Sequence, residues 1–331
     1  MSLPLFIQYP SWISPEIIPG IAALRFFRWY GLMYVFAFAF AYLILNQQRK
    51  EGLLDSKNVK VSEDEVLSFI ATGFIFLIIG ARIFACLVYT PSGKYWRAPW
   101  LIFWPFDEQM NFTGLAGMSY HGGFIGGLLG MIFWCRRHKK PFLKWVDVMA
   151  VAIPCGYTFG RLGNFLNGEL YGRITTMPWG MVFPDASKFS ASIEWVKNFC
   201  AEISMKIPES GMVNLPRHPS QLYEAFFEGL FLFAVLWFLR KRKPFDGFLA
   251  SVYAAGYGLV RFFIEYFRMP DADMGYKIGN MKDAPIYINA SWFNFSTGQI
   301  LCFLMIVFGV TFGIVCYKIQ SKQKNEKKQN R

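Results

Sequence analysis

Charged residues are scarce in this chain of 331 residues. Asp, Glu, Lys and Arg together make up 17% of it, whereas soluble domains carry about 25%. Apolar residues make up 54% and aromatic residues 19%. A soluble fold of this size would need more charge for its surface, so the composition excludes that class. The sequence predicts an all-α polytopic membrane protein.

Several common catalytic signatures are also missing. The chain has three histidines, and His121 has no cysteine or carboxylate pair at metal-ligand spacing, so we expect no metal and no cofactor. The Gly-x-Ser-x-Gly turn of serine hydrolases does not occur in the sequence. An intramembrane aspartic peptidase needs two facing aspartates, and Asp147 alone is embedded in an apolar run.

The net charge of +12 does not indicate a nucleic-acid binder. Lysine and arginine come in short bursts between long apolar runs, whereas a nucleic-acid binder presents them together on one polar face. We therefore expect no nucleic-acid partner.

Two further features are lacking, a disulfide framework and a removable signal peptide. Five of the six cysteines lie in or beside apolar runs, and Cys200 stands alone outside them. We interpret all six as small hydrophobic residues. The first twenty residues hold no lysine or arginine but four prolines, which is unlike a signal peptide. No internal repeat is visible.

Seven apolar runs are long enough for a membrane-spanning helix, which needs about 20 residues. They lie at residues 26–45, 66–89, 118–135, 146–165, 221–239, 248–267 and 299–317. Pro154, Gly156, Gly160 and Gly163 interrupt the fourth run, so we expect that helix to be kinked and buried.

Clusters of lysine and arginine predict the orientation, because cytoplasmic loops carry an excess of both. Such clusters follow the first, third, fifth and seventh runs. The N-terminus is therefore expected outside and the C-terminus in the cytoplasm. The predicted parts are an extracytoplasmic interfacial segment 1–25, transmembrane helices 1–4 in 26–169, a small extracytoplasmic head region 170–220 with one short helix within 190–205, transmembrane helices 5–7 in 221–317, and a basic cytoplasmic tail 318–331.

Polar residues embedded in or beside the apolar runs gather at one level, with Asp147 near the cytoplasmic end of the fourth run as the exception. On the predicted topology they lie toward the outer ends of at least five helices: Arg25, Arg28, Tyr30, Arg82, His121, Arg161, Asn164, Glu169, Gln221, Tyr223, Glu224, Arg261, Glu265 and Arg268. Chance would scatter such residues over both leaflets. An ionisable side chain inside a membrane is costly without a partner, so this pattern predicts a shared polar cavity that opens outward.

Spacing in the sixth run supports this prediction. Tyr257, Arg261 and Glu265 are four residues apart, so they share one helical face, on which the carboxylate can hold the guanidinium. Arginine matches phosphate oxygens with paired hydrogen bonds, and the outer leaflet supplies phosphate on lipid headgroups. The predicted substrate is a lipid.

A stripe of small residues follows His121 in the third run. Gly122, Gly126 and Gly130 are four residues apart, a spacing that lets a neighbouring backbone approach closely. We therefore expect the His121 ring to be held against another helix rather than against lipid.

The run from Gly160 to Gly172 carries an arginine, two asparagines and a glutamate out of an apolar segment, and it resembles the signature of the bacterial prolipoprotein diacylglyceryl transferases. Further motifs similar to this family follow the same order along the chain: Arg28 to Tyr34, His121-Gly122-Gly123, Arg217 to Glu224, and Tyr257-Gly258 with Arg261, Glu265, Phe267-Arg268 and Pro270-Asp271. The similarity is weaker at 46–65, at 185–213 and in the tail. Phe124, where a leucine is expected, is a mild departure.

The resemblance implies an enzyme of the bacterial cytoplasmic (inner) membrane with its active site toward the periplasmic side. The implied reaction moves the diacylglyceryl group of phosphatidylglycerol to the lipobox cysteine thiol of a prolipoprotein signal peptide, forming a thioether and releasing glycerol phosphate. Phosphatidylglycerol, prolipoproteins and membrane lipids are the implied partners. The family's important residues fall on Tyr30, His121, Gly122, Arg161, Asn164, Glu169, Gly172, Arg261 and Glu265.

Candidate roles follow from this resemblance and from the chemistry. Catalytic roles are predicted for Tyr30, His121, Arg161, Arg261 and Glu265. Contacts with phosphatidylglycerol are predicted for Arg82, Gly122, Arg161, Asn164, Glu169, Gly172 and Tyr257. His121 is the candidate base for the thiol, or else it orients the headgroup. The guanidinium groups of Arg161 and Arg261 would meet the charge that develops on the leaving phosphate.

Structural roles stay open for the same residues. Arg161 and Arg261 would then be ion-pair partners of Glu169 and Glu265. His121 would be an interhelical hydrogen-bonder, Tyr30 and Tyr257 interface aromatics, and Arg82 a snorkelling arginine. The alternative function is an anion or lipid-headgroup transporter. Such transporters often show paired repeat halves and polar residues on the cytoplasmic side, whereas here the inner halves of the runs are almost uniformly apolar.

Overall fold

A computed structural model of the chain describes residues 6–18, 20, 28–56, 59–90, 92–106, 109–111, 114, 117–270, 275–279, 285–289 and 291–329. Arg25 and Asp271, which the sequence analysis singled out, lie outside the described residues. So do residues 1–5, 19 and 21–25 of the predicted N-terminal segment, residues 26–27 of the first predicted helix, and residues 330–331 of the predicted tail.

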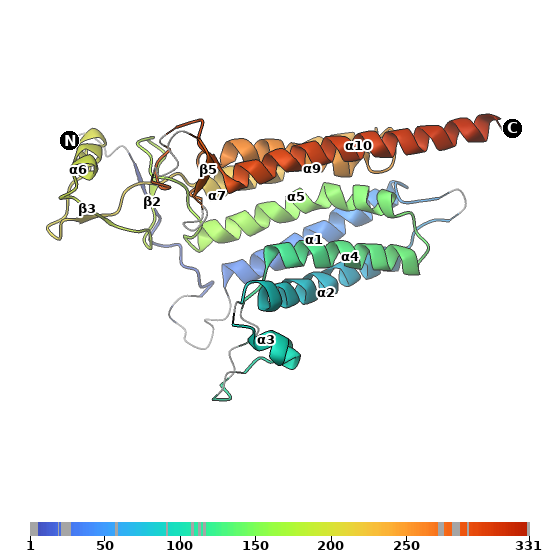
Figure 1. Cartoon of the computed structure of the whole chain (residues 1–331), viewed down its shortest axis with the longest axis horizontal. Helices are drawn as coiled ribbons and strands as arrows, with labels where there is room; N and C mark the ends of the chain where they lie inside the picture. The colour runs from blue at the N-terminus through green and yellow to red at the C-terminus, as the bar shows by residue number, and fades with distance from the viewer. Residues whose placement is uncertain are drawn as a thin grey trace. The chain divides into compact units, whose positions relative to one another are not determined.

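The described chain is mostly helical (Figure 1). Its helices are α1 (Trp29–Lys50), α2 (Glu63–Val88), α3 (Lys94–Arg97), the 3-10 helix η2 (Pro99–Phe103), α4 (Tyr120–Arg137), α5 (Phe142–Leu166), α6 (Glu194–Glu202), α7 (Ser220–Tyr223), the π-helix η3 (Glu224–Phe231), α8 (Leu232–Leu239), α9 (Phe248–Ile264) and α10 (Thr297–Gln329). Its short strands are β1 (Ile7–Gln8), β2 (Met181–Val182), β3 (Phe189–Ser190), β4 (Met212–Val213), β5 (Tyr276–Ile278) and β6 (Phe295–Ser296). β1 pairs with β2 in parallel, and the pairs β3 with β4 and β5 with β6 are antiparallel.

Five helical segments of the described chain are long and apolar enough to cross a membrane. They are α1, α2, α5, the continuous segment Ser220–Leu239 formed by α7, η3 and α8, and Thr297–Glu326 within α10. α9 is a shorter apolar helix, and α4 overlaps most of the third predicted run. Each of the seven predicted runs therefore contains a helix, and the chain is a mostly helical membrane protein.

Several helix boundaries differ from the prediction by a few residues, and two of the differences have a clear local reason. α2 begins at Glu63, before the predicted residue 66, because the Ser62 hydroxyl accepts the Glu65 N–H and the Glu65 carboxylate accepts the Ser62 N–H. α10 continues to Gln329, beyond the predicted end at 317. Its polar end is rich in lysine and glutamine, which are good helix formers, and a Lys322–Glu326 pair one turn apart adds a little support.

The chain divides into two compact units, Tyr42–Met149 and Met1–Ala41 with Ala150–Arg331. In Tyr42–Met149, α2 and α4 pack along each other (Figure 1). A Cβ on Gly126 would lie 2.2 Å from the Phe76 carbonyl oxygen, and one on Gly122 would lie 2.4 Å from the Gly80 carbonyl oxygen. The predicted small-residue stripe is confirmed, because side chains there would force the two backbones apart.

Gly126→Ala is expected to destabilise the α2–α4 pair, because its methyl group would overlap the Phe76 carbonyl. We expect a loss of about 1–3 kcal/mol, typical of overpacking, measured as a lower thermal unfolding midpoint in detergent. Gly127→Ala is the matched control in the same helix, since its nearest neighbour would be Leu77 Cβ at 3.8 Å. Equal midpoints for the two variants would contradict close backbone packing as the cause.

In the other unit, α9 and α10 also approach through glycines. A Cβ on Gly258 would lie 2.7 Å from the Cys302 carbonyl oxygen, and one on Gly309 would lie 2.6 Å from the Ala255 nitrogen. This close packing fixes α9, the helix that carries Arg261 and its neighbours.

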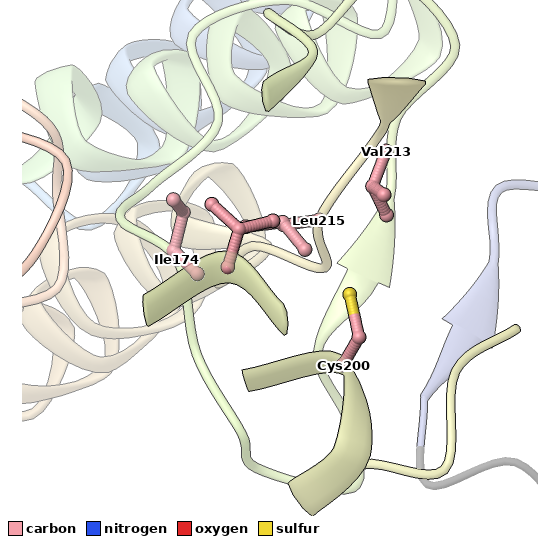
Figure 2. Close-up of a cluster of buried hydrophobic side chains, with 5 residues drawn as sticks. Ile174, Cys200, Val213 and Leu215 are labelled. Carbon is pink, nitrogen blue, oxygen red and sulfur yellow. The ribbon is translucent and has the colours of Figure 1, made fainter. Parts of the chain in front are cut away.

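Residues 170–219 form a small region of short strands and one helix, α6, which confirms the short helix predicted within 190–205. Its core is a cluster of Ile174, Val196, Cys200, Val213 and Leu215, four of which Figure 2 labels. Burial raises the pKa of the Cys200 thiol, and all six cysteines are buried free thiols. The N-terminal segment joins this region through β1, and the Tyr9 hydroxyl donates to the Phe165 carbonyl at 2.8 Å.

Candidate active site

Arg161 lies near the C-terminal end of α5, the helix that contains Pro154 and continues on both sides of it. Its Nε is 3.0 Å from Glu224 Oε2 and donates to the Tyr157 hydroxyl at 2.8 Å. The guanidinium also stacks over the Tyr157 ring, 4.8 Å from its centroid. Tyr157 is one turn before Arg161, so α5 supplies both the cation and the ring beneath it.

Arg261 reaches the same carboxylate from α9. Its Nη1 donates to Glu224 Oε2 at 2.8 Å and to Glu228 Oε1 at 3.2 Å, and its Nε is 3.5 Å from Glu265 Oε2. The pairing of Arg261 with Glu265, expected from their spacing, is confirmed. Arg161 and Arg261 therefore meet at one shared oxygen of Glu224.

Glu224 and Glu228 lie in the π-helical stretch η3, and their side chains are fully buried. Such stretches are rare inside membrane or soluble helices and are frequent at functional sites. The Tyr157 hydroxyl donates to the Glu228 carboxylate and lies 3.3 Å from Glu224. α5, η3 and α9 are thereby joined by one network of charged hydrogen bonds, which are stronger than neutral ones.

The network extends to Arg268, whose Nη1 is 3.9 Å from Glu265 Oε2. Its charged members are then the guanidinium groups of Arg161, Arg261 and Arg268 and the carboxylates of Glu224, Glu228 and Glu265. The formal charges of these six side chains cancel. Buried charges persist in a protein when they are paired in this way.

Several hydrogen-bond donors of the network have no acceptor among the residues that the structure describes. Both terminal nitrogens of Arg161 and Nη2 of Arg261 make no hydrogen bond or ion pair with a described residue. The Arg161 side chain is 17% exposed and that of Arg261 11%. The carboxylates therefore orient the two guanidinium groups without occupying all their donors.

Asn164 and Glu169 form a second cluster at the end of α5. Asn164 Nδ2 donates to Glu169 Oε1 at 3.0 Å and Asn167 Nδ2 donates to the same oxygen at 3.3 Å. Gln221 on α7 donates to the Glu169 carbonyl at 2.6 Å. The alternative pairing of Arg161 with Glu169 is wrong, because Glu224 is the carboxylate beside Arg161 and amides hold Glu169.

Gly172 connects the chain after α5 to the chain after α9. Its N–H donates to the His218 carbonyl at 2.8 Å, and the next residue, Arg173, donates its N–H to the Phe267 carbonyl at 2.9 Å. A Cβ on Gly172 would lie 2.3 Å from the Phe267 oxygen, so this position admits no larger residue without a shift. The contact ties the end of the Arg161 helix to the residue before Arg268.

Three basic residues that sequence reasoning did not place in the site support this junction. Arg173 is 2% exposed, and its Nε donates to the Arg268 carbonyl at 2.8 Å. Arg217 is 1% exposed and lies over the Tyr171 ring. Burial lowers the pKa of both arginines. Burial, and then the Arg173 charge, lower the pKa of His218 to about 4, so His218 is neutral at pH 7.

Tyr257 and Tyr30 are the two predicted aromatic members. The Tyr257 ring meets the Tyr157 ring edge to face with centroids 5.8 Å apart, which places Tyr257 beside the arginine network. Tyr30 on α1 lies against Gly163, where a Cβ would be 3.2 Å from the Tyr30 ring, and its hydroxyl is 3.2 Å from that of Tyr34.

His121, Gly122 and Arg82 lie in the unit Tyr42–Met149. His121 is exposed, and its Nδ1 is 2.7 Å from the hydroxyl of Tyr89, which follows α2. That hydrogen bond agrees with the open alternative in which His121 bonds to a neighbouring helix. Arg82 is 4% exposed and donates to the carbonyls of Ile102 at 2.5 Å and Gly117 at 3.2 Å. Such burial is unlike a snorkelling side chain.

Sequence reasoning missed Tyr157 and Glu228, and it did not rank Glu224 among the site residues. Their spacing held a usable signal, because Tyr157 and Arg161, like Glu224 and Glu228, are one turn apart. The residues that the family resemblance marks as important are other members of the site and not these three.

Comparison with known proteins agrees with the motifs. A family model described as prolipoprotein diacylglyceryl transferase matches residues 20–315. A phosphatidylglycerol–prolipoprotein diacylglyceryl transferase of Treponema denticola is 53% identical over 338 positions, which cover 98% of each chain. A protein of the same name from Treponema pallidum is 51% identical over 92% of this chain and 94% of its own length. One from Chlorobaculum tepidum is 41% identical over 96% of this chain and 93% of its own length. The chain belongs to the prolipoprotein diacylglyceryl transferase family.

Proposed function

We propose that this chain transfers the diacylglyceryl group of phosphatidylglycerol to the lipobox cysteine thiol of a prolipoprotein. The product is a thioether, and glycerol phosphate is released. The observation that carries this proposal is the meeting of Arg161 and Arg261 at Glu224, with guanidinium donors left over. Family membership and full-length similarity to enzymes of this name support the reaction.

The chemistry explains why fixed arginines are needed. The thiol loses a proton, its sulfur bonds to the glycerol carbon of the diacylglyceryl group, and the electron pair of the broken carbon–oxygen bond goes to phosphate. A phosphodiester with one negative charge thereby becomes a monoester whose second pKa is about 6. Guanidinium groups already aimed at the leaving oxygen stabilise this new charge without reorganising.

We assign the roles accordingly. Arg161 and Arg261 bind the phosphate, and Glu265 with Glu224 holds them in place. His121 takes the thiol proton or orients the headgroup, and Tyr30 has the catalytic role that the family motif implies. Contacts with phosphatidylglycerol fall to the remaining predicted residues: Arg82, Gly122, Asn164, Glu169, Gly172 and Tyr257.

The membrane placement that fits this role has seven spanning helices, an outer N-terminus and a cytoplasmic C-terminus. The lysine and arginine clusters after α1, α4, α8 and in α10 favour this orientation. In the bacterial inner membrane the Arg161 end of α5 and residues 170–220 would then lie on the periplasmic side, where prolipoproteins present their lipobox.

The test uses the purified full chain in detergent with phosphatidylglycerol and a lipobox peptide. We expect mass spectrometry to show the peptide gaining one diacylglyceryl group, with release of glycerol phosphate and no other component required. A peptide with serine in place of the cysteine is the control and should stay unmodified. With the same chain reconstituted in vesicles, lipid or anion flux without thioether formation would overturn the proposal in favour of a transporter.

A further inference from the structure

A groove of about 570 Å³ lies on the α2–α4 pair. Its lining is Phe76 from α2 and, from α4, Leu129, Ile132, Phe133, Arg136 and Arg137. None of these residues belongs to the candidate active site. The volume is within the range of about 300–1,000 Å³ that small-molecule sites occupy.

Helix geometry explains the shape of this groove. Leu129, Ile132 with Phe133, and Arg136 with Arg137 follow one another at three- and four-residue steps, so they form one stripe of α4 about 12 Å long. Gly130 lets α4 close onto α2, since a Cβ there would be 2.7 Å from Phe76 Cβ. Phe76 and Phe133 stack with centroids 5.4 Å apart. The groove is thus apolar and aromatic along its length.

One end of the groove is cationic. Arg136 and Arg137 are exposed and form no ion pair with any residue that the structure describes. Two of their basic neighbours are engaged, because Lys140 Nζ is 2.5 Å from Glu65 Oε1 and the His138 ring stacks on Trp134. Two guanidinium groups are therefore available at one end of the apolar groove.

We propose that this groove binds an anionic phospholipid at a site separate from the reaction. One acyl chain lies along Phe76, Leu129 and Phe133, and the phosphate accepts hydrogen bonds from Arg136 and Arg137. Paired guanidinium donors match phosphate oxygens, and basic pockets between membrane helices recognise anionic headgroups in this way. The proposal does not depend on the reaction, only on the chain being a membrane protein.

Arginines at a helix C-terminus have another explanation, since they complement the helix dipole and set membrane orientation. That explanation requires charge at the end of α4 but no preference among lipids. The groove proposal requires that the acyl chain and the arginine charges both contribute to lipid binding. A preference among lipids therefore distinguishes the two explanations.

The test measures lipid adducts on the purified full chain in detergent by native mass spectrometry. We add phosphatidylglycerol, phosphatidylserine or phosphatidylcholine, and use Arg261→Gln as the background to weaken binding at the candidate active site. In that background one adduct of either anionic lipid is expected to bind more tightly than phosphatidylcholine. Adding Arg136→Gln with Arg137→Gln is expected to weaken it about tenfold or more, since each basic residue near a membrane surface contributes measurably to anionic lipid binding.

Two further variants sharpen this measurement. Leu129→Trp keeps both arginines and fills the groove, so it should weaken the same adduct even if the double glutamine variant does not fold. Lys322→Gln with Lys324→Gln removes two charges from the exposed end of α10 and should leave the adduct unchanged. Three results would overturn the proposal. The first is equal affinity for phosphatidylcholine and the anionic lipids, and the second is unchanged lipid binding by the groove variants. The third is competition by free glycerol phosphate that equals competition by an intact anionic lipid. Because the readout is an adduct and not a product, a chain without transferase activity still tests it.

Discussion

Arg161→Lys and Arg261→Lys are each expected to lower diacylglyceryl transfer by about a hundredfold to a thousandfold, the usual loss when one fixed donor to a developing negative charge is removed. Lysine keeps the positive charge but lacks the planar guanidinium fork. In the arginines that fork contacts Glu224 with one nitrogen, and its other N–H groups remain for phosphate. The measurement is the rate of thioether formation with purified variants, normalised to the amount of protein extracted from membranes.

The matched control for these two variants is Arg242→Lys. Arg242 is exposed and stacks on Phe238 at the end of α8, so the same exchange there should leave transfer near the wild-type rate. Both site variants should still insert in the membrane, since their charge is unchanged. Transfer close to wild type in both would show that the two guanidinium groups do not act on the phosphate.

Glu224→Ala is expected to lower stability by about 3–5 kcal/mol, because removing one partner of a buried pair leaves the opposite charge uncompensated. The Glu224 side chain is fully buried and contacts both Arg161 and Arg261, so two guanidinium groups lose their shared carboxylate. The measurement is the thermal unfolding midpoint in detergent. Transfer should fall as well, since the arginines lose their orientation.

Glu224→Gln separates charge from shape in this prediction. Glutamine keeps the volume and one acceptor oxygen, so it should be more stable than alanine at this position and still transfer poorly. Glu326→Ala serves as the control, because its side chain is 58% exposed and its partner Lys322 is 4.0 Å away. Exposed pairs of this kind contribute little. A midpoint for Glu224→Ala equal to that of Glu326→Ala would contradict the paired role.

Helices were the part of this fold that the sequence predicted best. Each apolar run contains a helix because membrane spans must satisfy their own backbone hydrogen bonds. The π-helical stretch η3 was not predictable, since the segment Glu224–Phe231 has the same apolar composition as an α-helical span. The pairing of β1 with β2 joins residues 7–8 to residues 181–182, and so short a strand leaves no periodic signal.

The site was predictable only in part, for a related reason. Local spacing predicted the pairing of Arg261 with Glu265, because the two residues are one helical turn apart. It could not identify the contact of Arg161 with Glu224, because those residues come from different helices whose packing is a tertiary property. Glu228 lies one turn after Glu224 in an apolar run, and that spacing alone does not show that both carboxylates face a cation on α9.

The cancelling charges of the arginine–glutamate network bear on turnover. An empty site of zero net charge needs no counterion from solution, so it can rest inside a lipid bilayer. A bound phosphodiester adds one negative charge to this balance, and the monoester that leaves adds up to two. On the proposed assignment, the three glutamates that pair with the arginines repel the doubly charged product, so the same side chains that prepare the site also favour product release.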